Sequence, residues 1–130
     1  MASLTEAQIA LFKAKNFAAL GTMRADGTPH VSPVWVDYDG ENIIFNTAVG
    51  RAKALHIERD PRVTLAIWSA ENAYEYVEVS GVAELTDEGG QEGINFMAKK
   101  YLGEDVYPWS KPGEKRLAGK VTAVTVRGMQ

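Results

Sequence analysis

The residues with the clearest chemical potential are two cations at a junction between a strand and a helix, in the stretch TAVGRAK. Thr47 ends an extended segment, a turn of small residues follows, and Arg51 and Lys53 come next. Cations in the first turn of a helix are unfavourable unless an anion compensates for them. A hydroxyl, free backbone N–H groups and two cations together suit a phosphate group. In the alternative interpretation both cations pair with nearby acidic residues, Glu58 or Asp60, or with solvent.

Several other chemistries are disfavoured by what the sequence lacks. The only histidines are His30 and His56, and neither lies in an H-E-x-x-H pattern, so we expect no catalytic metal. The chain has no cysteine and no G-x-S-x-G motif, which disfavours covalent hydrolysis. It also lacks the glycine-rich signatures of Rossmann and Walker phosphate sites. Any anion site must therefore be a local one.

Composition and charge narrow the class of protein. The chain has 130 residues, 45% of them hydrophobic and 24% charged, which predicts a single domain over residues 1–130 with one core. The formal net charge is -3, so there is no global attraction to nucleic acid or anionic membrane. The sequence shows neither a signal peptide nor an apolar run of membrane-spanning length. We expect a soluble, cytoplasmic protein.

The cation pair must be positioned by a mainly β framework. Six segments have the alternation or the β-branched content of strands: residues 17–24, 29–38, 41–47, 62–69, 74–86 and 120–128. Asp-Gly turns separate the first three, and Gly81 indicates a bulge or bend in the fifth. Helices are predicted over residues 4–15, 50–59 and 88–101, the first from the capping pattern Ser3-x-x-Glu6. Six mostly antiparallel strands favour a Greek-key barrel, because closure removes exposed edges.

Two long runs carry a family resemblance: RADGTPHVSPVWVDYDGENIIFNTAVGRAKALHIERDPRVTLAI (24–67) and KKYLGEDVYPWSKPGEKR (99–116). They resemble the pyridoxamine-5'-phosphate-oxidase-like split β-barrel superfamily, and within it the flavin/deazaflavin oxidoreductase B group of probable F420-dependent enzymes. The specific motifs are D-G-x-P-x-V-S-P-V-W, G-R-A-K and R-D-P-R-V. The resemblance implies a homodimer of six-stranded antiparallel Greek-key split barrels, with two cofactor sites at the dimer interface.

The resemblance also implies roles for individual residues. Arg51 and Lys53 match the basic pair that holds the cofactor phosphate, in a supporting turn formed by Thr47, Ala48 and Gly50. The strand beside the isoalloxazine or deazaflavin ring is matched by Ser32, Pro33, Val34 and Trp35. Asn46 matches a position that can hydrogen-bond the ring edge. Tyr74 and Tyr76 match aromatic positions near the pocket that can reach the other subunit's site, and Trp109 and Lys111 match the loop before the last strand.

Each of these roles has a structural alternative. Val34, Trp35 and Tyr76 can be barrel core or dimer contacts, and His30 can be a surface strand residue rather than a proton donor. Five basic residues form a cluster in sequence that is either a solvated face or a site for the polyglutamate tail of a deazaflavin: Lys99, Lys100, Lys111, Lys115 and Arg116.

The resemblance implies an F420-dependent reductase that transfers a hydride from the reduced deazaflavin to a conjugated planar molecule such as a quinone, an enoate or lactone, or a tetrapyrrole. No residue is assigned as a general acid. FMN presents a phosphate to the same cations, so an FMN-dependent oxidase or reductase is the alternative enzyme. A non-catalytic cofactor-binding or carrier protein is the alternative from another class.

Overall fold

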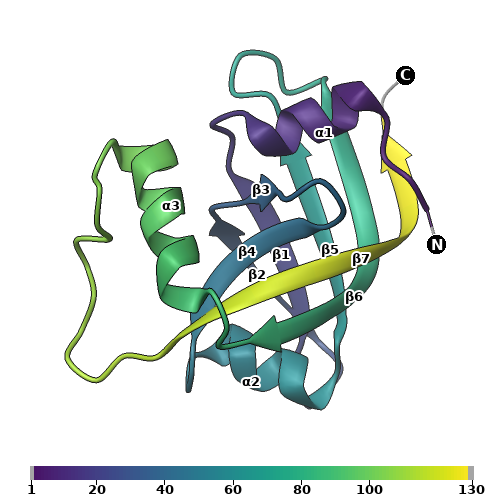
Figure 1. Ribbon diagram of the computed structural model, residues 1–130. Coiled ribbons are helices and arrows are strands. Elements are labelled where there is room, and N and C mark those ends of the chain that lie inside the picture. The colour runs from purple at the N-terminus through teal and green to yellow at the C-terminus, as the bar shows by residue number, and fades with distance from the viewer. Residues whose placement is uncertain (1, 129–130) are drawn as a thin grey trace.

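The computed structural model describes residues 2–128, and its strands form one antiparallel sheet (Figure 1). The strands are β1 (Ala18–Met23), β2 (Pro29–Val34), β3 (Asp37–Tyr38), β4 (Ile43–Ala48), β5 (Arg62–Trp68), β6 (Tyr76–Thr86) and β7 (Arg116–Gly128). Their spatial order is β2-β1-β5-β6-β7-β4-β3. The mainly β class is confirmed, with seven strands where the sequence predicts six.

The additional strand arises because the segment 29–38 is divided. Only Trp35 and Val36 separate β2 from β3, yet these two strands form opposite edges of the sheet. The sheet must therefore curl until its edges approach each other, which produces a split barrel. At the crossing, the N–H of Val36 donates to Tyr101 Oη at 3.1 Å, and its carbonyl accepts from Lys100 Nζ at 2.6 Å. Side chains of a helix thus replace the missing ladder partners of Val36.

The barrel interior is filled by alternate residues of the strands. The largest fully buried side chains include Leu20, Phe45 and Leu65 from the strands and Phe12 from the N-terminal helix. Phe45 lies directly over Gly119 of β7, where an added Cβ would be 2.3 Å from the ring, so the close strand contact requires glycine. The predicted irregularity at Gly81 is confirmed by a register shift between Ser80 and Gly81.

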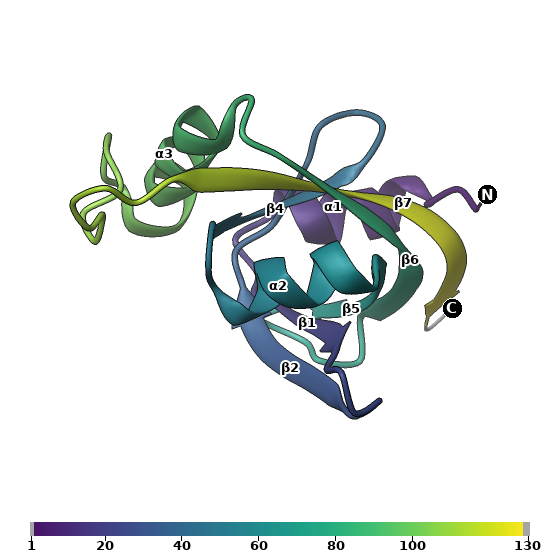
Figure 2. The same cartoon turned by 90° about the horizontal axis from the view of Figure 1, so that it is seen from below.

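Three helices surround the barrel: α1 (Glu6–Lys13), α2 (Ala52–Arg59) and α3 (Gly90–Leu102). The first two lie at opposite ends of the barrel, whereas α3 and the loop that follows it stand at one side (Figures 1 and 2). The capping box of α1 uses Thr5 and Gln8, so the predicted box of Ser3 and Glu6 is wrong. The two overlapping patterns are chemically equivalent, and only the structure selects one.

The last strand is longer than predicted. It begins at Arg116, because residues 116–121 pair with β4. Within residues 2–128, none of the helices is long and apolar enough to cross a membrane.

Candidate functional site

A cleft of about 210 Å³ lies between β2, β4, α3 and the loop of residues 103–115. It brings together most of the sequence-predicted site residues, namely Pro33, Val34, Trp35, Asn46, Thr47, Arg51 and Lys53. Other lining residues come from the position just before β1, from α3, from the loop and from β7: Phe17, Ile94, Met97, Tyr107, Trp109 and Arg116. The cleft therefore has an apolar side formed by aromatic residues and α3, and a cationic end at α2.

The cationic end is shaped by the turn between β4 and α2. The N–H of Arg51 donates to the carbonyl of Ala48 at 3.1 Å, and Gly50 has φ 87°, which residues with a side chain rarely adopt. This turn places Arg51 as the N-terminal capping residue of α2, without a side-chain cap on the helix. Thr47 and Ala48 are buried beneath the turn. The chain thus presents backbone donors and cations at the same point.

Lys53, in the first turn of α2, is a partly buried cation that lines the cleft. No carboxylate among residues 2–128 forms an ion pair with it. Burial, and then the neighbouring charge of Arg51, lowers the pKa of Lys53. Because both effects disfavour the ammonium form, an anion bound here would relieve an existing electrostatic cost.

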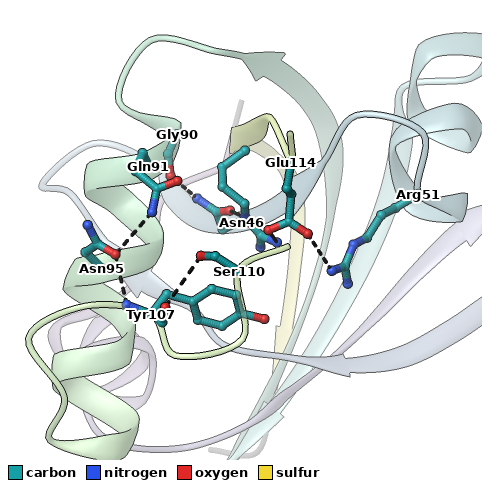
Figure 3. Close-up of polar contacts among 9 residues, drawn as sticks. Asn46, Arg51, Gly90, Gln91, Asn95, Tyr107, Ser110 and Glu114 are labelled. Atoms are coloured by element: carbon teal, nitrogen blue, oxygen red, sulfur yellow. Dashed lines mark hydrogen bonds and ion pairs between the residues drawn. The ribbon is translucent and has the colours of Figure 1, made fainter. Parts of the chain in front are cut away.

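Arg51 has an internal partner, but not one of the expected acids. Its guanidinium contacts Glu114 Oε2 at 3.1 Å, and Glu114 Oε1 accepts from Arg116 Nη1 at 3.2 Å. Figure 3 shows this carboxylate directed toward the guanidinium of Arg51. Partial burial opposes ionisation of Glu114, but the hydrogen bonds from both arginines outweigh it and lower its pKa. Neither Glu58 nor Asp60 pairs with Arg51, and Asp60 pairs instead with Arg62.

Asn46 is engaged within the protein on both sides of its amide. Its Oδ1 accepts from Arg116 Nε at 2.8 Å. Its Nδ2 donates to the carbonyl of Gly90 at 2.8 Å, the contact that Figure 3 shows. The guanidinium of Arg116 also lies 5.1 Å from the centre of the Tyr107 ring. In this structure Asn46 therefore orients Arg116 and joins β4 to the start of α3.

Aromatic side chains form the opposite part of the cleft. Trp35 stacks on Tyr101 with ring centroids 5.2 Å apart and an interplanar angle of 6°. Tyr107 meets Trp35 edge-on, and Trp109 lies 6.1 Å from Trp35. Trp109 and Phe17 remain more than half exposed. Such surfaces suit a planar ligand, which stacks on rings with little loss of side-chain entropy.

Two further polar groups point inward from β2. Ser32 Oγ and His30 Nδ1 are buried and have no hydrogen-bond partner within the described part of the chain. His30 lies 5.2 Å from His56, whose Nδ1 is hydrogen-bonded to Thr22 at 2.9 Å. Burial, and then the charge of His30, lowers the pKa of His56. His30 is thus partly buried rather than a surface residue of its strand.

The remaining predicted positions are not gathered at the cleft. Tyr74, in the turn before β6, and Tyr76, the first residue of β6, are both exposed, so a contact with a partner's site stays a prediction. The basic cluster is also not one surface. Lys100 is held by the carbonyls of Phe12 and Val36, and Arg116 is buried. Lys99, Lys111 and Lys115 remain exposed, and two of these three pair with acidic residues.

Sequence reasoning missed several residues of the cleft. Ile94 and Met97 share a helical face that indicates ordinary core packing, and they do pack inward while also lining the cleft. Phe17 and Tyr107 carry no local signal, because only the tertiary fold brings them to β2. The role of Glu114 could not be predicted, since its partner Arg51 lies 63 residues away in sequence.

Comparison with known families decides the assignment. A model of the family described as Pyridoxamine 5'-phosphate oxidase matches residues 4–130 of the chain. The chain belongs to the pyridoxamine 5'-phosphate oxidase family. The cleft of this family member fits a planar cofactor with a phosphate, because it joins an aromatic wall to Lys53, a partly buried cation with no counter-ion among residues 2–128.

Several solved structures resemble the chain over nearly its whole length. An F420 reductase is 25% identical with a TM-score of 0.82, covering 95% of this chain and 98% of the other. A conserved hypothetical protein from Mycobacterium tuberculosis is 26% identical with a TM-score of 0.72, covering 96% of this chain and 84% of the other. General Stress Protein 26 from Bacillus anthracis, at 20% identity and a TM-score of 0.69, covers 93% of this chain and 89% of the other and shares the fold.

Proposed function

We propose that this protein is a homodimeric, F420-dependent oxidoreductase that reduces a conjugated planar small molecule. The observation that carries the proposal is the position of Lys53, a partly buried cation with no acidic partner among residues 2–128, at the end of an aromatic cleft. The deazaflavin, rather than another phosphate-bearing cofactor, is supported by the similarity to an F420 reductase.

Different residues of the cleft bind different parts of such a cofactor. Lys53 and Arg51 bind the phosphate, together with the uncapped N–H groups at the start of α2. Residues 32–35 of β2 and its continuation flank the ring, and Ser32 Oγ is a hydrogen-bonding group without a partner in the described chain. When bound, the reduced deazaflavin supplies the hydride for the substrate.

The apolar side of the cleft governs access of water and substrate. Ile94 and Met97 of α3 are buried and close the cleft from one side. Tyr107 and Trp109 cover it from the loop and offer flat surfaces to a planar substrate. No carboxylate among residues 2–128 lines the cleft, and the neighbouring Glu114 is held ionised by two arginines, so we assign no general acid and take the proton from solvent.

The homodimer is supported by the outer face of the sheet. A groove of about 670 Å³ crosses β1, β2, β5 and β6 on this face, and small residues such as Ala19, Gly21 and Ala66 form its floor. Exposed Val31, Val82 and Val124 border it. A contiguous apolar face of this kind marks a protein interface, and we propose a second copy of the chain as its occupant.

FMN is the second candidate cofactor, because its phosphate suits the same two cations and the family is named for an oxidase. A turnover assay tests which of the two cofactors the protein uses. Reduced F420 is mixed with a panel of quinones, enoates and tetrapyrroles, and its oxidation is followed by absorbance over many turnovers. We expect multiple turnovers with F420, and a roughly 10- to 150-fold higher concentration of reduced F420 needed for half-maximal rate after replacement of Lys53 by Met. Tight binding without turnover on any substrate would favour a carrier protein, and turnover only with reduced FMN would refute the choice of deazaflavin.

A further inference from the structure

Glu114 occupies an unusual position for an anion-binding cleft, since it places a carboxylate among the cations. Its side chain is 9% exposed, and its two oxygens accept from two different arginines, Arg51 and Arg116. Arg116 is itself held by Asn46 and lies against the Tyr107 ring. The carboxylate is therefore a built part of the site rather than a mobile surface group.

This carboxylate changes the charge that a ligand meets. Arg51, Lys53 and Arg116 line the cleft, so three cations and one carboxylate leave a net charge of +2. Of the two arginines that line the cleft, Arg51 is the more exposed, and its guanidinium is already paired with Glu114. A bound phosphate would be attracted by the cations and repelled by Glu114, and both effects scale with the charge of the phosphate.

The two candidate cofactors differ in that charge. The phosphate of FMN is a monoester, which carries a charge approaching -2 at neutral pH. The phosphate of F420 joins the ribityl chain to a lactyl group, so it is a diester with one negative charge. Repulsion by Glu114 acts twice as strongly on the monoester as on the diester, and it removes part of the advantage that cations give to a dianion.

We propose that Glu114 is a specificity-determining residue that lowers the preference of this cleft for a phosphate monoester over a phosphate diester. The inference rests on the proposed function, in which Arg51 and Lys53 hold the cofactor phosphate. It goes further by assigning the choice between deazaflavin and flavin cofactors to a residue of the loop before β7.

The test uses three ligands with the same ring and different charge: riboflavin, the methyl ester of FMN, and FMN. Each is titrated by fluorescence against the wild-type protein and against Glu114→Gln, which keeps an oxygen acceptor but removes the charge. At a separation of ~6 Å in a partly solvated cleft, a unit charge is worth on the order of tenfold in affinity. We expect Glu114→Gln to bind the methyl ester about 10-fold and FMN about 100-fold more tightly, with riboflavin unchanged.

Asp105→Asn is the matched control. It removes one negative charge from the same loop, but Asp105 is 88% exposed and pairs with Lys99 instead of the arginines. Equal gains for both phosphorylated ligands, no gain for either, or the same gains in Asp105→Asn would overturn the inference. If Glu114→Gln does not fold, Glu114→Ala is compared with the wild type in the same way: it must raise the affinity for FMN more than the affinity for the methyl ester.

Failure of the proposed function is distinguishable from failure of this inference. If the wild-type protein does not bind F420, the proposed function fails, while the riboflavin series still measures the effect of Glu114. If F420 binds but the two phosphorylated flavins respond equally to Glu114→Gln, only the inference fails. Absence of binding by every phosphorylated ligand to both variants overturns both.

Discussion

Replacement of Lys53 by Met is expected to have opposite effects on the free and the cofactor-bound protein. Lys53 is partly buried beside Arg51 at the positive end of α2, and no described acid compensates for it. Met keeps the length and the apolar stem of the side chain while removing the charge. The free protein therefore loses an electrostatic cost, whereas the bound protein loses a contact to the phosphate.

The expected changes in stability and in cofactor affinity follow from these contacts. A cation at the wrong end of a helix costs ~0.3–1 kcal/mol, so the free variant should be stabilised by about that amount. For a domain of this size, that gain corresponds to a rise in Tm of about 1 to 4 °C. A charge-assisted hydrogen bond to phosphate contributes ~1.5–3 kcal/mol, so the Kd for cofactor should rise roughly 10- to 150-fold.

The lowered pKa of Lys53 also makes the stability of the free protein depend on pH. The pKa of Lys53 in the folded protein lies below its ordinary value of 10.5, so the unfolded chain binds more protons between these two values. The free energy of unfolding of the free protein should therefore rise as pH increases from the folded pKa toward 10.5. This contribution is absent in Lys53→Met.

Urea unfolding of the free proteins and fluorescence titration with cofactor measure both effects. Lys13→Met is the matched control, because Lys13 lies in the last turn of α1, where a cation is favourable. It should leave the Kd unchanged and slightly destabilise the protein. A Lys53→Met variant that is less stable than wild type, or that binds cofactor equally well, would refute the assignment of Lys53 to the phosphate.

Three other predictions concern the interface, the barrel crossing and the basic loop. Val82→Asp on the outer face should convert a wild-type dimer to a monomer in light scattering, whereas Val106→Asp in the loop should not; a monomeric wild type would contradict the dimer. Tyr101→Phe removes the partner of the Val36 N–H and should lower the free energy of unfolding by ~1–3 kcal/mol in urea; a loss under ~0.5 kcal/mol would disprove this role. If exposed Lys111 and its neighbours bind a polyglutamate tail, affinity for F420 should rise with tail length and fall with salt, and equal affinity of short and long tails would exclude it.

Local chemistry explains which parts of the site the sequence could predict. The turn with Gly50, the cations Arg51 and Lys53, and the start of α2 are contiguous in the chain, so their spacing alone indicates an anion site. Strand alternation and Asp-Gly turns likewise identify the strands to within a few residues, because these signals are local.

The parts that were missed depend on distant partners. The division of β2 from β3 requires Tyr101 and Lys100 to satisfy the backbone of Val36, and these residues lie on a helix 64 or more positions away. The pairing of Glu114 with Arg51 likewise joins residues that are far apart in the sequence. Asn46 lines the cleft, but its hydrogen bonds to Arg116 and Gly90 follow from the packing of α3 against β4 and β7.

Native mass spectrometry of the protein mixed with equal amounts of F420 and FMN tests the central claim most directly, because it reports the cofactor and the stoichiometry together. The account predicts a dimer carrying two deazaflavin molecules, and loss of these adducts in Lys53→Met. A monomer, a dimer that carries only FMN, or a protein that binds neither compound would contradict it.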